Sequence, residues 1–437
     1  MTQATRRRIS TAAWEGLVGL ARDCFSSPSF SLFATILTGW VLAPGRRTIT
    51  GMICAADPEG NRAHDAYHRF FRAGRWSTQE IWKVLVVHMV GVPCPAGTLV
   101  VDLDDTLYKK SGRKIDGAGT FRDAVRSTRS KVVYATGLNL VIVTLRVSPP
   151  WGGMPIGVPA GVRLHRKGGP TTLDLAEEII CELACWLPER DFALCGDGAY
   201  ASLAGRGLPR TSVTSRMRRD AAIYEAAPPK TGKRGRPRTK GQRLPAPAEM
   251  AARLSDTEFT SATAEWRGGT KDLLVWSRPV LWYSVDKQHL VQLVIVRDPA
   301  GVMHDDFFFT TGLDADPAWV ASHYAGRWSI ECVNREVKQV IGAEDPQCWK
   351  HQGPERAASL SLWLYAAIWA WYIPAFGTTT TWIPRPWYPK KATPSFLDAL
   401  AALRRCMWSE RFTPLSAPEP LNPKIIEGML DALTRAA

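Results

Sequence analysis

Three carboxylates lie within four residues at the end of an apolar run, in the segment VDLDDTLY, residues 101–108. An apolar run of this kind is typical of a buried strand, so Asp102, Asp104 and Asp105 should stand near a strand end. Such acids suit two kinds of chemistry on phosphate esters. One carboxylate can attack phosphorus with acid–base help from another, or the carboxylates can hold a divalent metal ion, which prefers hard oxygen ligands.

The first chemistry finds matching motifs in order along the chain. In a haloacid-dehalogenase-like phosphatase, Asp102 and Asp104 would be the nucleophile and the acid–base. Thr144 would supply the hydroxyl of a second motif, and Asp197 in GDG would bind the metal. That last motif normally carries a second acid a few residues on, and Ala201 stands there, which leaves Mg²⁺ short of carboxylates. This interpretation also leaves the C-terminal half of the chain unexplained.

The segment HYAGRWSIECVNREVKQVIG, residues 323–342, favours the second chemistry. On a helix, Tyr324, Arg327, Glu331 and Lys338 fall in one narrow stripe. The opposite face is apolar and should pack on a sheet, through Ile330, Val333, Val337, Val340 and Ile341. One acid framed by two cations and a phenol therefore points outward from a helix with a buried back. The alternative is a solvated helix face with an ordinary ion pair.

The elements that must position these residues change character along the chain. Residues 1 to about 95 show apolar residues at helical spacing, whereas TLVVDLDD, NLVIVTLRV and GVRLHR show strand patterns. A helix, TTLDLAEEIICELACWL, and a strand, DFALCGDGAY, follow, and the strand carries Asp197. This order is the opening half of a ribonuclease-H-like sheet, although doubly wound phosphatase sheets share parts of it.

We predict an α/β fold: a ribonuclease-H-like mixed sheet flanked by helices, interrupted by a β-rich insertion, with helical N- and C-terminal regions. The insertion begins with the tract PPKTGKRGRPRTKGQR, which has no means of forming a core, and strand-like segments follow it. The predicted parts are a helical DNA-binding domain (1–95), the first catalytic part (96–215), the insertion (216–315), the second catalytic part (316–375) and a helical C-terminal region (376–437).

Composition narrows the partner and the compartment. Lys and Arg number 55 against 41 Asp and Glu, and the pI is near 9.5, so a polyanion such as nucleic acid is the leading partner. The nine cysteines are scattered without paired zinc-site spacing, which suits reduced thiols in the cytosol. The N-terminal segment lacks the apolar core of a secretion signal. The uncharged segment within 357–384 is expected to be a buried helix, so we expect a cytoplasmic protein without a membrane span.

The spacing of Tyr324, Arg327, Glu331 and Lys338 resembles the Y-R-E-K signature of DDE insertion-sequence transposases, which belong to the ribonuclease-H-like superfamily. The phrases DDTLYKKSGRKIDGAG, CGDGAYAS and RMRRDAAIYEAAPPKTGKRGRPR resemble that family as well, so the resemblance covers nearly the whole chain. It implies a ribonuclease-H-like fold with a β-rich insertion and a catalytic triad of two Asp and one Glu. It also implies a bacterial, nucleoid-associated enzyme that cleaves transposon ends and joins their 3′-hydroxyls to target DNA.

Carried over to this chain, the triad that would bind metal and catalyse is Asp104, Asp197 and Glu331. Family members commonly read Asp, one residue, Thr, which selects Asp104 as the first acid. Asp105 would point to the opposite face of the strand, and Asp102 lies earlier on the same face. Three carboxylates suit Mg²⁺ or Mn²⁺ and can hold two ions about 4 Å apart in one active site.

The implied partners are double-stranded DNA, as terminal inverted repeats and target, and a second copy of the chain in a homodimeric synaptic complex. Arg327 and Lys338 would contact phosphates beside the scissile bond, and Tyr324 would orient a phosphate or simply pack. A DNA-binding protein without catalysis, derived from a transposase, is the remaining alternative.

Further DNA contacts are predicted outside the triad. Two lysines follow the first acid, three arginines lie in the Gly-Arg-Pro tract, and two tryptophans in the insertion are candidates for stacking on a flipped base. For the tryptophans we favour a place in the sheet core, and for the arginines non-specific phosphate contact. A helix pair in the N-terminal part, with Arg62, His68, Arg69 and Arg72, is either a helix-turn-helix that reads DNA or an ordinary helical pair. The two lysines are Lys109 and Lys110, the three arginines are Arg234, Arg236 and Arg238, and the two tryptophans are Trp266 and Trp282.

Overall fold

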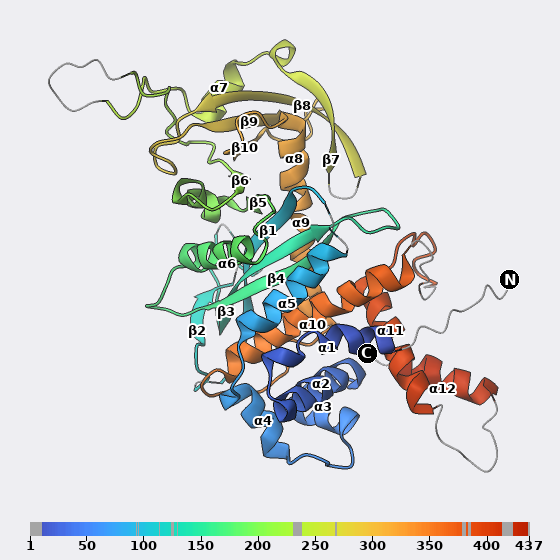
Figure 1. Ribbon diagram of the computed structural model, residues 1–437. Helices are drawn as coiled ribbons and strands as arrows, with labels where there is room; N and C mark the ends of the chain where they lie inside the picture. Colours follow the sequence, from blue (N-terminus) through green and yellow to red (C-terminus); the bar gives the residue numbers. More distant parts are fainter. Residues whose placement is uncertain are drawn as a thin grey trace.

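The computed structural model describes residues 11–92, 94, 96–112, 114–123, 126–128, 130–229, 238–266, 269–377, 382, 386–412 and 423–435. A mixed sheet of ten strands runs through the molecule, with helices packed against it (Figure 1). The predicted mixed α/β fold is therefore confirmed. The strands are β1 (Leu99–Lys109), β2 (Gly119–Arg122), β3 (Tyr134–Val147), β4 (Ile156–His165), β5 (Phe192–Gly196), β6 (Thr211–Arg216), β7 (Thr260–Trp266), β8 (Gly269–Val280), β9 (Val291–Arg297) and β10 (Asp306–Thr310).

The strand order is β2-β3-β1-β5-β6-β10-β9-β8-β7, and β4 pairs with β3. β1 is antiparallel to β3 and parallel to β5, and β5 is parallel to β6. Residues 138–145 of β3 are all buried, because this strand is covered on both faces and therefore reads as a continuous apolar run. The predicted order of three strands, one helix and a fourth strand appears as β1, β3, β4, α6 and β5. Two strands were missing from the prediction, the short edge strand β2 and β6, which pairs with β5.

Helices cover the sheet and fill one end of the molecule (Figure 1). The α-helices are α1 (Ala12–Gly19), α2 (Ser27–Leu42), α3 (Ile49–Ala56), α4 (His64–Ala73), α5 (Thr78–Gly91), α6 (Thr172–Trp186), α7 (Pro247–Arg253), α8 (Pro317–Gly326), α9 (Trp328–Gln339), α10 (Gly353–Phe376), α11 (Phe396–Phe412) and α12 (Pro423–Arg435), and three 3₁₀ helices are η1 (Arg22–Cys24), η2 (Gly198–Arg206) and η3 (Asp256–Glu258).

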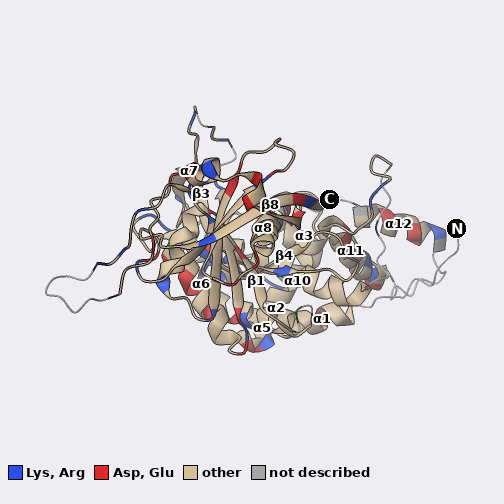
Figure 2. Ribbon diagram, turned by 90° about the horizontal axis from the view of Figure 1, so that it is seen from above, with Lys and Arg blue, Asp and Glu red and all other residues tan. Residues whose placement is uncertain are grey.

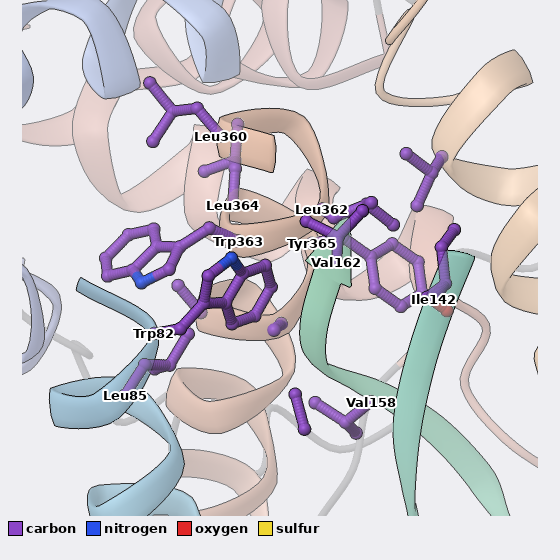
Figure 3. Packing of buried hydrophobic residues seen from close by; sticks show 14 of the residues in the cluster. Trp82, Leu85, Ile142, Val158, Val162, Leu360, Leu362, Trp363, Leu364 and Tyr365 are labelled. Carbon is purple, nitrogen blue, oxygen red and sulfur yellow. The ribbon is translucent and has the colours of Figure 1, made fainter. Parts of the chain in front are cut away.

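The N-terminal helices share one hydrophobic core with the sheet and with α10. Figure 3 shows Trp82 of α5 beside Trp363 of α10, with Val158 and Ile142 of the sheet nearby. The indole of Trp82 donates to the hydroxyl of Ser359 at 3.0 Å, and the indole of Trp363 donates to the carbonyl of Ile81 at 2.9 Å. Both buried N–H groups are therefore satisfied across the contact between the two helices.

Helix α10 is the one helix, among the residues the structure describes, that is long and apolar enough to cross a membrane. Within its most apolar 18-residue window, 83% is buried inside the protein. It lies between the N-terminal helices and β4 (Figure 1). This burial is what a core helix shows, as the sequence predicted for this segment.

The predicted β-rich insertion continues the main sheet. Its strand β10 pairs antiparallel with β6, so β7 to β10 extend the sheet that carries the acids. Two smaller apolar clusters, one beside α7 and the other beneath α8, pack on its faces. Because β6 and α8 flank the insertion in sequence and pack near each other, the insertion is anchored beside the acids.

Candidate active site

Asp104 and Asp197 lie where the parallel pairing between β1 and β5 stops. The prediction that the acids of residues 102–105 stand near a strand end is wrong, because β1 continues to Lys109 through its pairing with β3. Leu103 of β1 lies opposite Gly196 of β5, so each acid is the next residue along its chain. The carboxylate of Asp197 also accepts the amide of Ala199 at 2.9 Å and thereby caps η2. The parallel register therefore brings together two acids that are far apart in sequence.

Glu331 comes to these two acids from α9. The sequence predicted one continuous helix from Tyr324 to Lys338, and this is corrected: the helix is interrupted at Arg327, where α8 ends and α9 begins. The amide of Arg327 bonds to the carbonyl of Tyr324 at 3.2 Å, a tightened turn next to Gly326, which has low helix propensity. The predicted apolar back of the helix is confirmed, since Ile330, Val333 and Val337 are fully buried and Ile341 nearly so.

The guanidinium of Arg327 lies between two of the three acids. Its Nη1 atom is 3.6 Å from Asp104 and 3.8 Å from Glu331. Its Nε and Nη1 atoms are buried without a hydrogen-bond partner among the described residues. A buried donor without an acceptor costs free energy, so these N–H groups could bond to a further oxygen acceptor. The contact of Arg327 with a DNA phosphate stays a prediction.

Burial and neighbouring carboxylates raise the pKa of Asp104 to about 8. Burial is the largest cause, followed by the negative charge of Glu331, while Arg327 acts in the opposite direction and Asp105 and Asp197 add smaller increases. Arg327 therefore offsets only part of the combined effect of burial and of the neighbouring carboxylates on the pKa of Asp104. Perturbation of this kind clusters at functional sites.

The donor chemistry at these acids fits Mg²⁺ or Mn²⁺, since a dication would add positive charge beside them and carboxylate oxygens are its preferred ligands. As they stand, the described residues contain no group of three His, Cys, Asp or Glu side chains close enough to hold one ion. Asp104 and Glu331 instead share Arg327.

The other two acids of the opening segment have different surroundings. Asp102 is fully buried, forms a bidentate ion pair with Arg146, and accepts the hydroxyl of Ser329 at 2.9 Å. Asp105 accepts the phenol of Tyr200 at 3.1 Å. The phosphatase alternative needed Asp102 as an accessible nucleophile, and its burial in an ion pair removes that role.

Tyr324 and Lys338 flank the acids from the same helix pair. The ring of Tyr324 packs against Phe308 of β10 at 4.5 Å between centroids, and the Arg327 guanidinium lies 5.7 Å from the Tyr324 ring. The ammonium of Lys338 donates to the hydroxyl of Thr106 at 2.6 Å, and burial lowers the pKa of Lys338. Thr106 follows Asp105 on β1, so this hydrogen bond places the ammonium of Lys338, from α9, beside the acids. Its contact with DNA phosphate stays a prediction.

The two lysines after the first acid are held by the protein itself. Lys109 is half exposed and pairs with Asp123 at 3.0 Å. Lys110 donates to the main-chain carbonyls of Glu344 and Pro346 at 2.6 and 3.1 Å. The side chain of Lys109 is partly exposed in this ion pair, whereas the ammonium of Lys110 holds the loop after α9. Their contacts with DNA stay predictions.

The candidates in the insertion fall into three groups. Trp282 is buried with its ring edge against Phe309, as the core interpretation predicts, so it is not exposed to a base in this conformation. Trp266, at the end of β7, is partly exposed. Arg238 is exposed, and Arg234 and Arg236 lie outside the described residues. Positions of Lys and Arg are interspersed with those of Asp and Glu along the ribbon (Figure 2).

In the N-terminal helix pair, α4 turns Tyr67, Phe70 and Phe71 into the core. Arg62, Arg69 and Arg72 are exposed and His68 is half-buried. These placements suit both interpretations of the pair, so DNA reading by α4 stays a prediction.

Sequence reasoning did not find Arg146, which lies on β3 and holds Asp102. Its signal is a single cation in the apolar run NLVIVTLRV, where a buried charge requires a partner. Ser329, one of the other partners of Asp102, gave no signal, because a serine on a helix is common and its contact is long-range.

A mixed sheet with one acid on β1, a second directly after the adjacent parallel strand β5, and a third on helix α9 is consistent with the ribonuclease-H-like class of nucleases. The family model for DDE superfamily endonucleases matches residues 22–273, more than half of the 437-residue chain. The chain belongs to this family. The matched range contains Asp104 and Asp197 but ends before Glu331. No curated protein sequence matches the chain.

Proposed function

We propose that this endonuclease is a transposase that cleaves the ends of a mobile DNA element and joins the freed 3′-hydroxyls to target DNA. The observation that carries the proposal is the position of Arg327 between Asp104 and Glu331, because it brings the predicted third acid to the strand that bears the first. The Y-R-E-K spacing of 324–338 supports the same assignment. DNA is the substrate that the family implies.

Each residue has a distinct part in the proposed reaction. Asp104, Asp197 and Glu331 would hold one or two divalent ions, which supply activation of the attacking oxygen and stabilisation of the leaving oxygen when bound. Arg327 presents unpartnered buried N–H groups and would bind a phosphate oxygen at the scissile position. Lys338 supplies a second cation on the same side. Two active sites, one from each copy in a homodimer, would process the two ends of the element.

The test uses the purified protein with linear DNA from the sequence that flanks its own gene. With Mg²⁺ present, we expect 3′-hydroxyl ends at the element boundary and joined products when a target plasmid is added. Salt-sensitive binding that leaves the strands intact at every Mg²⁺ and Mn²⁺ concentration would instead favour the non-catalytic DNA-binding alternative.

Metal binding is expected to release nearly one proton per active site at pH 7. With a pKa of about 8, Asp104 is about nine-tenths protonated in the metal-free protein, and a bound dication requires the carboxylate. Calorimetry of Mn²⁺ binding in two buffers of different ionisation enthalpy measures this release. Affinity should weaken about tenfold per pH unit below pH 8. A proton release near zero at pH 7, with binding intact, would contradict the environment described for Asp104.

The raised pKa of Asp104 also makes the stability of the metal-free protein depend on pH. The folded protein keeps a proton on Asp104 between about pH 4 and pH 8, whereas the unfolded chain has released it. The free energy of unfolding therefore falls as pH rises through this window. Asp104→Asn should remove this slope and raise the free energy of unfolding at pH 8 by at most about 5 kcal/mol. Denaturant titrations at pH 5 and pH 8 test this, and an unchanged slope would contradict it.

A further inference from the structure

We infer that Asp102 and Arg146 form a buried bracket that positions the third acid against the first. The bracket is defined as Asp102 on β1, Arg146 on β3, and their contacts with the junction of α8 and α9. The inference rests on the proposed function of Asp104 and Glu331 as partners in one site. It gives Asp102 a positioning role through other residues, because its fully buried carboxylate cannot touch substrate.

The bracket joins the two elements that carry the catalytic acids. On one side, Asp102 precedes Asp104 by two residues and points to the same face of β1. On the other side, Ser329 precedes Glu331 by two residues on α9 and donates its hydroxyl to Asp102 at 2.9 Å. A single carboxylate therefore connects the backbone that bears the first acid to the helix that bears the third.

Arg146 adds a second connection to the same junction. Its Nε donates to Asp102 at 3.0 Å, and its Nη2 donates both to Asp102 and, at 2.9 Å, to the carbonyl of His323 near the end of α8. The planar guanidinium fixes direction as well as distance, which a lysine ammonium would not do. Arg327, which contacts both acids, lies directly between the two anchored positions, His323 and Ser329.

Gly326 leaves room for this guanidinium. A Cβ at Gly326 would lie 2.8 Å from the Cζ of Arg146 and would overlap its Nη1. Gly326→Ala should therefore displace Arg146 without removing any charge. Because alanine is the better helix former, this variant separates the geometry of the bracket from helix stability.

The bracket lies outside the ligand shell, yet it bears on metal binding. Mg²⁺ demands nearly ideal octahedral geometry, so a small displacement of Glu331 relative to Asp104 should weaken it. Residues that orient metal ligands typically change metal affinity or activity by 10- to 100-fold when replaced. A 10- to 100-fold loss of metal affinity in a variant of Asp102 that is still folded could not be explained by lower stability alone.

The experiment compares Asp102→Asn and Gly326→Ala with the matched control Asp398→Asn. Asp398 is also a buried carboxylate in an ion pair, with Lys391, but it caps α11 away from the acids. We expect Asp102→Asn and Gly326→Ala to raise the Mg²⁺ concentration for half-maximal DNA cleavage about tenfold or more, with less loss in Mn²⁺. We expect Asp398→Asn to leave this concentration unchanged. An equal response in Asp102→Asn and Asp398→Asn would overturn the inference.

Hydrogen exchange supplies a readout that does not depend on activity. Amides of residues 323–331 should exchange faster in Asp102→Asn than in the full-length wild-type protein, whereas Asp398→Asn should affect the start of α11 instead. If the wild-type protein shows no metal-dependent cleavage, the proposed function fails while this measurement still decides the bracket. Unchanged exchange over 323–331 in Asp102→Asn would overturn the bracket whatever the activity of the wild type.

Discussion

Replacing Glu331 with Gln is expected to lower the rate of Mg²⁺-dependent DNA cleavage by about a thousandfold or more. The substitution keeps the size of the side chain and removes the charge that a divalent ion would neutralise, so the loss should exceed the 10- to 100-fold typical of residues behind the ligands. Arg327 retains Asp104 as its partner at 3.6 Å. DNA binding without metal should therefore be unchanged or slightly tighter, since one negative charge near the phosphate is lost. Single-turnover cleavage and filter binding of the same labelled DNA measure the two effects.

Glu336 on the same helix provides the matched control. It accepts the phenol of Tyr365 at 2.7 Å, and burial raises the pKa of Glu336. Glu336→Gln changes the same charge five residues away and keeps an oxygen that can accept from Tyr365. We expect cleavage within about threefold of wild type. If both variants lose cleavage equally, or if Glu331→Gln cleaves normally, Glu331 is not the third acid.

The candidate acids could be singled out from the sequence because each one has a local pattern, while their role as a catalytic triad stays a prediction that rests on the family resemblance. Asp104 follows an apolar run within β1, Asp197 follows β5, and Glu331 lies on a helix whose apolar back repeats at helical spacing. The function of Asp102 could not be predicted in the same way. Whether a strand acid binds metal or an arginine depends on Arg146, which comes from another strand and reaches Asp102 only through tertiary packing.

For the fold as well, local elements could be predicted from the sequence, whereas the contacts between distant segments could not. Strands and helices follow from the periodicity of their own residues, and most predicted elements appear near the expected positions. The joining of β6 to β10 depends on backbone hydrogen bonds between segments about ninety residues apart, for which side-chain patterns carry no register. The packing of the N-terminal helices into the core of the sheet likewise depends on which apolar faces meet, as at Trp82 and Trp363.

Replacing Gly39 with Ala is expected to lower the free energy of unfolding by about 3 kcal/mol. Gly39 lies in the buried face of α2, and a Cβ there would lie 2.7 Å from the carbonyl carbon of Met52 in α3 and overlap its oxygen. The obstacle is backbone, so the two helices must move apart to admit the methyl group. The intrinsic helix preference of alanine, about 1 kcal/mol, offsets only part of this cost. Urea unfolding followed by tryptophan fluorescence measures the change.

Gly16→Ala in α1 is the control, because no described atom beyond the backbone of its own helix lies within 4 Å of the added Cβ, and the helix should gain up to about 1 kcal/mol. The pair of variants also tests how the N-terminal helices relate to the active site. These helices share one core with β1 and α10, so Gly39→Ala should shift a single transition that includes the loss of hydrogen-exchange protection in β1. If the N-terminal helices unfold at lower urea while β1 stays protected, they form a separate cooperative unit. In that case unfolding of the N-terminal helices in Gly39→Ala would leave the active site folded, and the variant would still cleave DNA.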